Sequence, residues 1–136
     1  MRVLPVLGLL LVLATPALAE DEPDVDCANA MAQPDLNDCA YREYQAADAE
    51  LNAVYRQAMT AAQKVDKELE DADIGAVEAL KTAQRAWIGY RDGQCELAGF
   101  QARGGQAEPM LVSGCLAQLT QKRTAELNEF LEAQGN

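Results

Sequence analysis

Hydrophobic and polar positions follow a helical period along three long stretches of the chain. From Cys39 to about Lys67, small and apolar residues recur every three to four positions, and no glycine or proline interrupts them. The same spacing runs from near Asp73 to about Leu97 and from Met110 to about Ala133. Residues spaced in this way lie on one face of a helix. No stretch alternates with a period of two over a useful length, so the pattern predicts an all-α fold.

Two polar segments separate the three predicted helices. Acids dominate residues 66–73, and because acids stabilise the amino terminus of a helix, we place the end of the first helix and the start of the second there. Residues 98–109 contain three glycines and a proline, which predicts a loop. Short connections join neighbouring helices, so we predict a small helical bundle, with a long antiparallel helical hairpin plus a third helix. Asp35 or Asn37 is expected to cap the first helix, and Gly135 to end the third.

One stripe of the second predicted helix mixes polar and aromatic residues. At helical spacing, Gln84, Trp87, Ile88, Arg91 and Cys95 share one face. An ordinary core helix would carry aliphatic residues there. The polar members must therefore either satisfy one another inside a bundle or mark a functional site.

The facing residues of the hairpin favour the structural interpretation. If the chain turns near residue 70, Asp48 lies near Arg91 and Tyr55 lies near Trp87. Carboxylate and guanidinium match in geometry, so we predict a semi-buried ion pair between Asp48 and Arg91. Arg123 lies inside an apolar stripe of the third helix and is expected to join them, because an unpaired inward charge is costly. We interpret the set as a structural polar network that fixes helix register. Its members are Asp48, Gln84, Trp87, Arg91 and Arg123.

The first 19 residues have the pattern of a signal peptide. Arg2 provides a positive start, Val3 to Leu13 is apolar, and Ala17-Leu18-Ala19 is a small-residue cleavage signal. The apolar run is shorter than the roughly 20 residues that span a bilayer, although an uncleaved membrane anchor is the alternative. We predict a mature chain that begins at Glu20 and is periplasmic or secreted, with no membrane contact after cleavage.

The mature chain is predicted to contain one domain. Residues 20–38 form an acidic leader and a short N-terminal segment, and we expect the leader to be poorly ordered up to Cys27. Residues 39–136 form the helical domain, with its functional part at 27–133. Without Arg2, 10 basic and 22 acidic residues remain, so the mature net charge is −12. This charge disfavours nucleic acid and anionic membranes and favours a cationic protein partner.

The four cysteines predict two disulfides. They are Cys27, Cys39, Cys95 and Cys115, an even number in a chain predicted to be exported. Metal binding is the weaker alternative, because the chain has no histidine and no C-x-x-C pair. The hairpin gathers all four cysteines at one end, but this geometry does not choose among the three pairings. Shorter loops favour Cys27–Cys39 and Cys95–Cys115, and each could contribute roughly 2–4 kcal/mol.

The residues needed for catalysis are missing. The chain has no histidine, its cysteines are expected to be oxidised, and Ser113, the mature chain's one serine, has no base in the sequence pattern. Paired acids could act on a glycosidic bond, but no spacing singles out such a pair. We therefore predict that the protein is not an enzyme and holds no cofactor or metal.

Two connections are the candidate partner-binding surfaces. One is the acidic segment between the first two helices, and the other is the glycine-containing loop before the third. The alternative for both is an ordinary solvated turn. The candidate residues are Asp66, Glu68, Glu70, Asp71, Asp73, Arg103, Gly104 and Gly105.

Motifs from all three predicted helices together match one family pattern. They are, in chain order, Cys27, Cys39-Ala40, Tyr44, Ala47-Asp48, Leu51-Asn52, Tyr55, Ala83-Gln84-Arg85-Ala86-Trp87-Ile88, Tyr90-Arg91-Asp92, Cys95, Cys115, Leu119-Thr120, Arg123 and Leu127. This combination resembles the LprI-type lysozyme-inhibitor N-terminal domain family over nearly the whole mature chain. The resemblance implies a small exported helical domain with two disulfides. Members with a much shorter loop before the last cysteine support the Cys95–Cys115 pairing.

The resemblance also implies a function. The family is named after a mycobacterial lipoprotein that inhibits lysozyme, although this chain lacks a lipid-attachment cysteine and is expected to be free in the periplasm. We therefore expect a non-catalytic protein-binding domain that resembles a lysozyme inhibitor, steered electrostatically to a basic lysozyme. The alternative is a structural or stress-related envelope protein with a non-lysozyme partner. No binding residue can be transferred from the family, and the sequence leaves the oligomeric state open.

Overall fold

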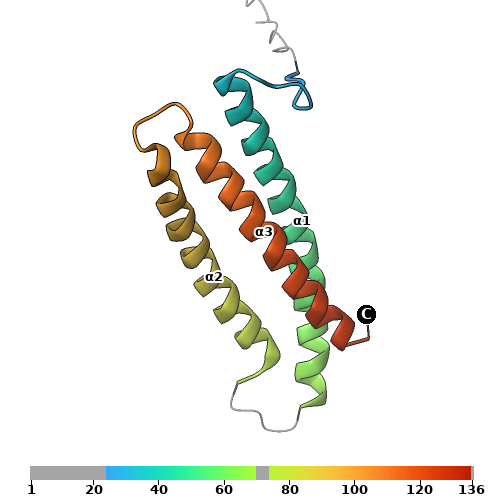
Figure 1. Ribbon diagram of the computed structural model, residues 1–136. Helices are drawn as coiled ribbons and strands as arrows, with labels where there is room; N and C mark the ends of the chain where they lie inside the picture. Colours follow the sequence, from blue (N-terminus) through green and yellow to red (C-terminus); the bar gives the residue numbers. More distant parts are fainter. Residues whose placement is uncertain (1–23, 70–73, 136) are drawn as a thin grey trace, which may run out of the picture.

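Three helices make up the computed structural model, which describes residues 24–69 and 74–135 (Figure 1). They are α1 (Gln33–Glu68), α2 (Ala76–Gly99) and α3 (Glu108–Ala133), and the short 3₁₀ helix η1 (Phe100–Ala102) extends α2. The described residues contain no strand. The predicted all-α helical bundle is therefore confirmed. The predicted signal peptide and residues 20–23 lie outside the described residues.

The first helix begins earlier than the sequence pattern predicted. It starts at Gln33 and not at Cys39, and Pro34 lies in its first turn, where the missing N–H of proline has no helical partner to lose. The expected cap by Asp35 or Asn37 is wrong. Ala32 holds the N-cap position without a side-chain hydrogen bond, and Asp35 lies within the first turn.

The other helix ends lie close to their predicted positions. The predicted loop 98–109 is reduced to residues 103–107, because α2 continues through η1 and α3 already begins at Glu108. Pro109 again lies in the first helical turn. Gly135 ends α3 with a positive φ of 75°, a conformation that glycine adopts without steric penalty.

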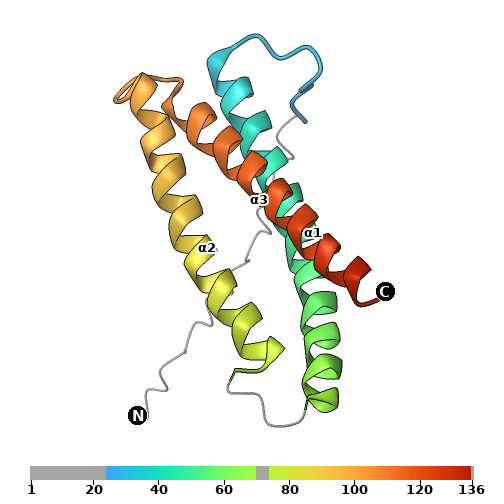
Figure 2. The same cartoon turned by 60° about the horizontal axis from the view of Figure 1, so that its bottom comes forward.

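The closest helix packing joins α1 to α3. Figures 1 and 2 show these two helices running in the same direction, with α2 returning antiparallel to both. Small buried residues line the facing sides of both helices: Ala58 and Ala61 of α1 cluster with Leu127 and Leu131, and Ala117 and Thr120 of α3 are fully buried. Because small side chains allow helix axes to approach closely, α1 contacts α3 far more extensively than it contacts α2.

A cluster of aliphatic residues forms the core, between residues 51–61 of α1 and the C-terminal end of α3. Leu51 and Leu127 are 2% and 3% exposed, and large partly buried residues of α2 and α3 pack against them. Burying side chains of this size stabilises the fold by roughly 1.5–3 kcal/mol each. The cluster contains Leu51, Val54, Ala58, Ala61, Leu127 and Leu131, with Tyr55, Leu80, Trp87 and Phe130 packed against it.

Both predicted disulfides are present. Cys27 pairs with Cys39 across a Cα–Cα distance of 5.6 Å, and Cys95 pairs with Cys115 across 5.3 Å. The first joins the N-terminal segment to the start of α1, and the second joins the end of α2 to the start of α3. All four cysteines therefore lie at the same end of the bundle, as the hairpin geometry predicted.

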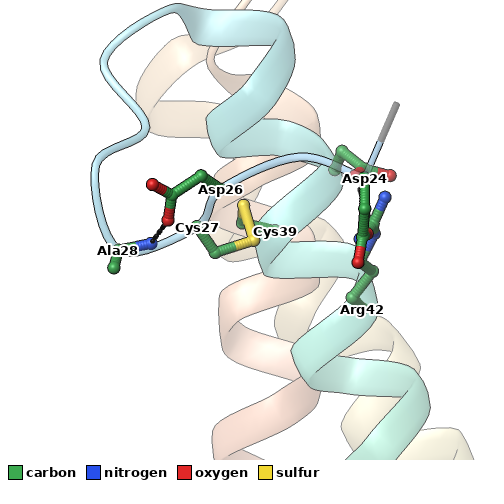
Figure 3. A network of polar contacts seen from close by, with 7 residues as sticks. Asp24, Asp26, Cys27, Ala28, Cys39 and Arg42 are labelled. Carbon is green, nitrogen blue, oxygen red and sulfur yellow. Dashed lines mark hydrogen bonds and ion pairs between the residues drawn. A yellow bond between two sulfur atoms is a disulfide. The ribbon is translucent and has the colours of Figure 1, made fainter. Parts of the chain in front are cut away.

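The leader contacts α1 from residue 24 onward. Figure 3 shows Asp24 against Arg42 of α1, beside the Cys27–Cys39 disulfide. Arg42 also binds Asp38 at 2.8 Å, and the hydrogen bond to Asp24 is the main reason that the pKa of Arg42 is raised. Residues 24–26 are thus held against the start of α1 by an ion pair and the neighbouring disulfide, while the expected poor order of the leader stays a prediction. Among the described helices, none is long and apolar enough to cross a membrane.

Candidate binding site between α1 and α2

The polar stripe of α2 faces α1 and centres on a buried arginine. Arg91 is only 8% exposed, and its guanidinium carbon lies 5.0 Å from the centroid of the Trp87 ring and 5.6 Å from that of Tyr44. Its Nε and Nη2 atoms each lie 2.8 Å from Oδ1 of Asp92, and Nη1 lies 3.7 Å from Oδ1 of Asp48. The guanidinium is therefore enclosed by two aromatic rings and two carboxylates.

This arrangement satisfies a charge that would otherwise be costly to bury. The side chains of Asp48 and Asp92 are 41% and 55% exposed, so both carboxylates remain hydrated while the guanidinium does not. Asp48 also accepts a hydrogen bond of 3.0 Å from the side chain of Asn52. The carboxylates and rings hold Arg91 in one orientation and fix the register of α2 against α1.

The residues grouped as one polar network form two separate clusters. Asp48, Trp87 and Arg91 meet between α1 and α2. Arg123 of α3 donates from Nε to Oε1 of Gln84 at 3.0 Å and from Nη1 to Glu126 at 2.9 Å. Arg123 does not reach Arg91's cluster because its partner Gln84 lies seven residues before Arg91, roughly 10 Å away along α2. Each cluster pairs its own arginine.

A groove lies between α1 and α2, next to the Arg91 cluster. Its volume is about 510 Å³, within the roughly 300–1,000 Å³ typical of ligand sites. Ile88 on its wall is 41% exposed, and within the described residues no carboxylate lies within ion-pair distance of Arg85. Tyrosine, methionine and arginine are enriched in protein interfaces. We name this the α1–α2 groove; its lining residues are Asn52, Tyr55, Met59, Lys81, Gln84, Arg85 and Ile88.

Sequence reasoning missed three members of this groove. Asn52, Lys81 and Arg85 lie beside the predicted contact stripes and not on them, whereas Met59 was an alternative to Ala58 on the stripe of the first helix. At this spacing these three residues lie at the side of the contact face, where side chains are solvated if two helices pack tightly. Because α1 and α2 contact each other only to a limited extent, these side chains line a groove instead.

Asp66, a predicted partner-binding residue, binds the backbone of α2. Its Oδ1 and Oδ2 atoms accept hydrogen bonds from the backbone N–H groups of Ala76 and Val77. A carboxylate in this position satisfies unpaired amides and stabilises the helix dipole. Gly75 fits because a Cβ there would lie 2.7 Å from Asp66 Oδ2. The cap joins residues ten positions apart, so no local sequence signal marks it.

The other acids of that segment divide into two groups. Glu68 is exposed at the end of α1. The remaining three candidates, Glu70, Asp71 and Asp73, lie outside the described residues.

The glycine-containing loop forms a self-contained turn. Arg103 binds Glu96 at 2.7 Å and Glu108 at 2.8 Å, and its guanidinium lies 4.6 Å from the centroid of the Phe100 ring. The hydrogen bond to Glu96 is the main reason that the pKa of Arg103 is raised. Gly104, with φ of 76°, donates its backbone N–H to Glu108 at 2.7 Å, and Gly105 closes the turn onto Ala102. The polar groups of this loop are thus bound within the chain.

The residues considered for catalysis have structural positions. Ser113 is buried in α3 at 9% exposure, and all four cysteines are in disulfides. Among residues 24–69 and 74–135, no three or more acidic or cysteine side chains gather in a way that could hold a metal ion.

Comparison with known proteins identifies relatives, one of which matches over nearly its whole length. The chain is 63% identical over 135 residues to "Uncharacterized protein R02472" of Rhizobium meliloti (strain 1021), a match that covers 97% of this chain and 96% of the relative. It is 31% identical over 80 residues to "Uncharacterized protein YecT" of Escherichia coli (strain K12), which covers 58% of this chain and 44% of that protein. No solved structure matches significantly.

A family model gives the assignment. The family described as "Lysozyme inhibitor LprI" matches residues 26–127. This range contains both disulfides, the buried Arg91 cluster and the α1–α2 groove. The chain therefore belongs to the LprI lysozyme inhibitor family.

Proposed function

We propose that this protein is an exported, non-catalytic protein-binding domain that acts in the periplasm as a lysozyme inhibitor. The observation that carries the proposal is the family match over residues 26–127. Two disulfides support export, because such bonds form and persist in oxidising compartments.

The charge of the chain supports a basic partner. Its formal net charge is −11, and many lysozymes are strongly basic. Opposite net charges accelerate encounter and orient the partners before contact. The acidic segment between α1 and α2, including the exposed Glu68, is proposed to contribute to this long-range attraction.

The contact surface itself is proposed to be the α1–α2 groove. Retaining and inverting glycosidases work with two carboxylates that flank the scissile bond. Arg85 presents a cation at the groove, Lys81 adds a second one that is paired with Glu78 at 2.9 Å, and Ile88 presents exposed apolar area beside them. Such a surface suits an acidic catalytic cleft, while the acidic remainder of the chain suits the basic surface around it.

A titration tests the proposal. The purified protein is added to c-, g- and i-type lysozymes acting on cell walls at low salt. We expect at least one type to be inhibited at near-stoichiometric amounts. If no type is inhibited at micromolar excess, the proposal is contradicted. The alternative function, an envelope protein with a non-lysozyme partner, would then be favoured.

A groove variant tests the contact surface separately. Ile88→Asp replaces the exposed apolar side chain with a charge that an acidic cleft repels, so inhibition should fall at least tenfold. Gln57→Asp, at an exposed position on the opposite side of α1 from the groove, adds the same charge and should leave inhibition unchanged. Equal effects of the two variants would exclude the groove as the contact surface.

A further inference from the structure

One face of α2 carries no charged side chain and is exposed from end to end. Its residues are spaced alternately by four and three positions, the spacing with which helices pack on one another. Tyr90, Leu97 and Phe100 on this face are 59%, 62% and 55% exposed. We name it the uncharged face of α2; its residues are Ala79, Ala83, Ala86, Tyr90, Gly93, Leu97 and Phe100.

We propose that a second copy of this chain docks antiparallel on the uncharged face of α2, about a twofold axis near Tyr90. A twofold contact uses the same surface on both copies, so that surface must be complementary to itself. Three features of the chain meet this condition, and none of them depends on the proposed inhibition of lysozyme.

The first feature is the distribution of residue size along the face. The first three positions are alanines, and the last two are the large residues Leu97 and Phe100. In the antiparallel arrangement, Ala79 lies opposite Phe100 of the other copy, and Ala83 lies opposite Leu97. Large side chains then pack over small ones at both ends of the contact. A parallel arrangement would place large side chains against each other at one end and leave a gap at the other.

The second feature is a groove where the large side chains would arrive. Ala79 and Ala83 also line a space of about 290 Å³ between α2 and α3, whose floor includes Leu80, Leu127 and Phe130. Phe100 and Leu97 of a second copy reach this space in the antiparallel arrangement only. Filling it would bury apolar area on both copies at each end of the dimer.

The third feature is the order of charges along the edge of the face. In the same register, Arg85 lies opposite Glu96 of the other copy, once on each side of the twofold axis. Each cation therefore meets an anion, and no two like charges face each other at these positions. Arg103 and Glu96 already bind each other within one chain, so the contact would extend an existing pair into a larger network.

The expected dimer is weak. The face is about 33 Å long at roughly 1.5 Å per residue, so one helix pair and two filled grooves bury less than the roughly 1,200–2,000 Å² of a stable interface. The net charge of −11 on each copy also opposes association. We expect dissociation in the micromolar range at about 0.15 M salt, where charges more than roughly 8 Å apart are screened.

Analytical ultracentrifugation of the protein expressed from its full sequence tests the proposal. Sedimentation is measured from low to high micromolar concentration, and a concentration-dependent dimer is expected. Ala86→Glu and Leu97→Glu place charges at exposed helix positions and should each weaken dimerisation at least tenfold, with helix content unchanged by circular dichroism. Gln118→Glu, an exposed position on α3, adds the same charge and should leave the dimer intact.

Single cysteine variants test the antiparallel register. Tyr90→Cys places two thiols near the twofold axis and should form a cross-linked dimer under mild oxidation. Ala79→Cys places them at opposite ends of the contact and should not. A chain that stays monomeric at all concentrations, a dimer unaffected by both Ala86→Glu and Leu97→Glu, or cross-linking through Ala79→Cys would overturn the proposal. Lysozyme inhibition by Ala86→Glu should equal that of the unaltered chain, which separates the two proposals.

Discussion

The two faces that α1 turns toward its neighbours differ in how closely they pack. The face of α1 toward α3 consists of alanines and aliphatic residues that are nearly all buried. The buried residues of α3 include Ala117, Thr120 and Leu127. Toward α2, α1 meets the rings and guanidinium of Trp87 and Arg91, and a groove remains beside them. Although a short connection joins α1 to α2, the closest partner of α1 is α3. Side-chain size therefore outweighs chain connectivity in choosing the tightest contact.

Shortening a side chain to alanine should give the largest difference in stability between these two regions. Leu127→Ala removes a buried side chain from the α1–α3 core, so the free energy of unfolding should fall by roughly 2–5 kcal/mol. Ile88→Ala, in the α1–α2 groove, should change it by about 0.5 kcal/mol or less. Urea denaturation monitored by circular dichroism measures both. Equal losses would show that the groove is as tightly packed as the core.

Enlarging a core residue should also cost more stability than a volume-conserving change in the groove. Ala58→Leu adds atoms where no space exists, since Ala58 is 0% exposed between α1 and α3, and should destabilise the fold by roughly 1–3 kcal/mol. Met59→Leu, the next residue along α1, lines the groove and conserves volume, so its effect should be below roughly 1.5 kcal/mol. A Met59→Leu variant less stable than Ala58→Leu would contradict the packing comparison.

The cap between α1 and α2 should make a smaller contribution. Asp66→Ala leaves the backbone amides of Ala76 and Val77 without their acceptor, so the free energy of unfolding should fall by about 1 kcal/mol, within a range of roughly 0.5–2. Glu68→Ala, an exposed neighbour without such a contact in the described residues, is the control and should be nearly neutral. Thermal unfolding compares the two variants, and identical midpoints would argue against the cap.

The ion pair across the open side should be weaker still. Asp48 is half exposed and lies 3.7 Å from Arg91, which has a closer partner in Asp92. Asp48→Asn should therefore cost roughly 0.2–1 kcal/mol, as exposed pairs do. The difference should shrink in high salt. A loss above several kcal/mol would mean that Asp48, and not Asp92, is the main counter-ion of Arg91.

The smallest expected effect depends on pH. The side chain of Asn29 and the backbone of Ala28 donate hydrogen bonds to Asp26, which lowers its pKa below the ordinary value of 3.8. A lowered pKa means that this stabilisation is complete above pH 3.8 and is lost as the pH falls through the lowered folded value. The difference in melting temperature between the protein and Asp26→Ala should therefore be present at pH 7 and vanish in strong acid. A difference that grows on acidification would reverse this sign.

Much of the fold could be predicted from local patterns. Helical periodicity identified all three helices because a buried stripe repeats every three to four residues, and an even number of cysteines near their ends indicated two bonds. The residue types of the polar stripe also indicated that Arg91 needed a carboxylate. The start of α1 was missed because the six residues before Cys39 carry little periodicity, and their helix is held by the Cys27–Cys39 bond and by contacts with the rest of the bundle.

The candidate site was less accessible to the sequence. Asp66 and Arg103 are common surface residues by composition, and only their partners show that both are bound within the chain. The α1–α2 groove exists because α1 packs closely on α3 and less closely on α2. The sequence pattern of a single helix does not show which of two neighbours it packs on more closely. The spacing of the residues that form the uncharged face of α2 is visible in the sequence, but only the tertiary structure shows that this face is exposed.

The sequence by itself determined the number of helices, the cysteine chemistry and the acidic character of this protein, because these follow from local spacing and composition. Only the tertiary structure decided which helices pack closely, which polar residues are used internally, and where a groove remains. The physical reason is that packing depends on contacts between residues far apart in the chain, and helices approach most closely where their facing side chains are smallest.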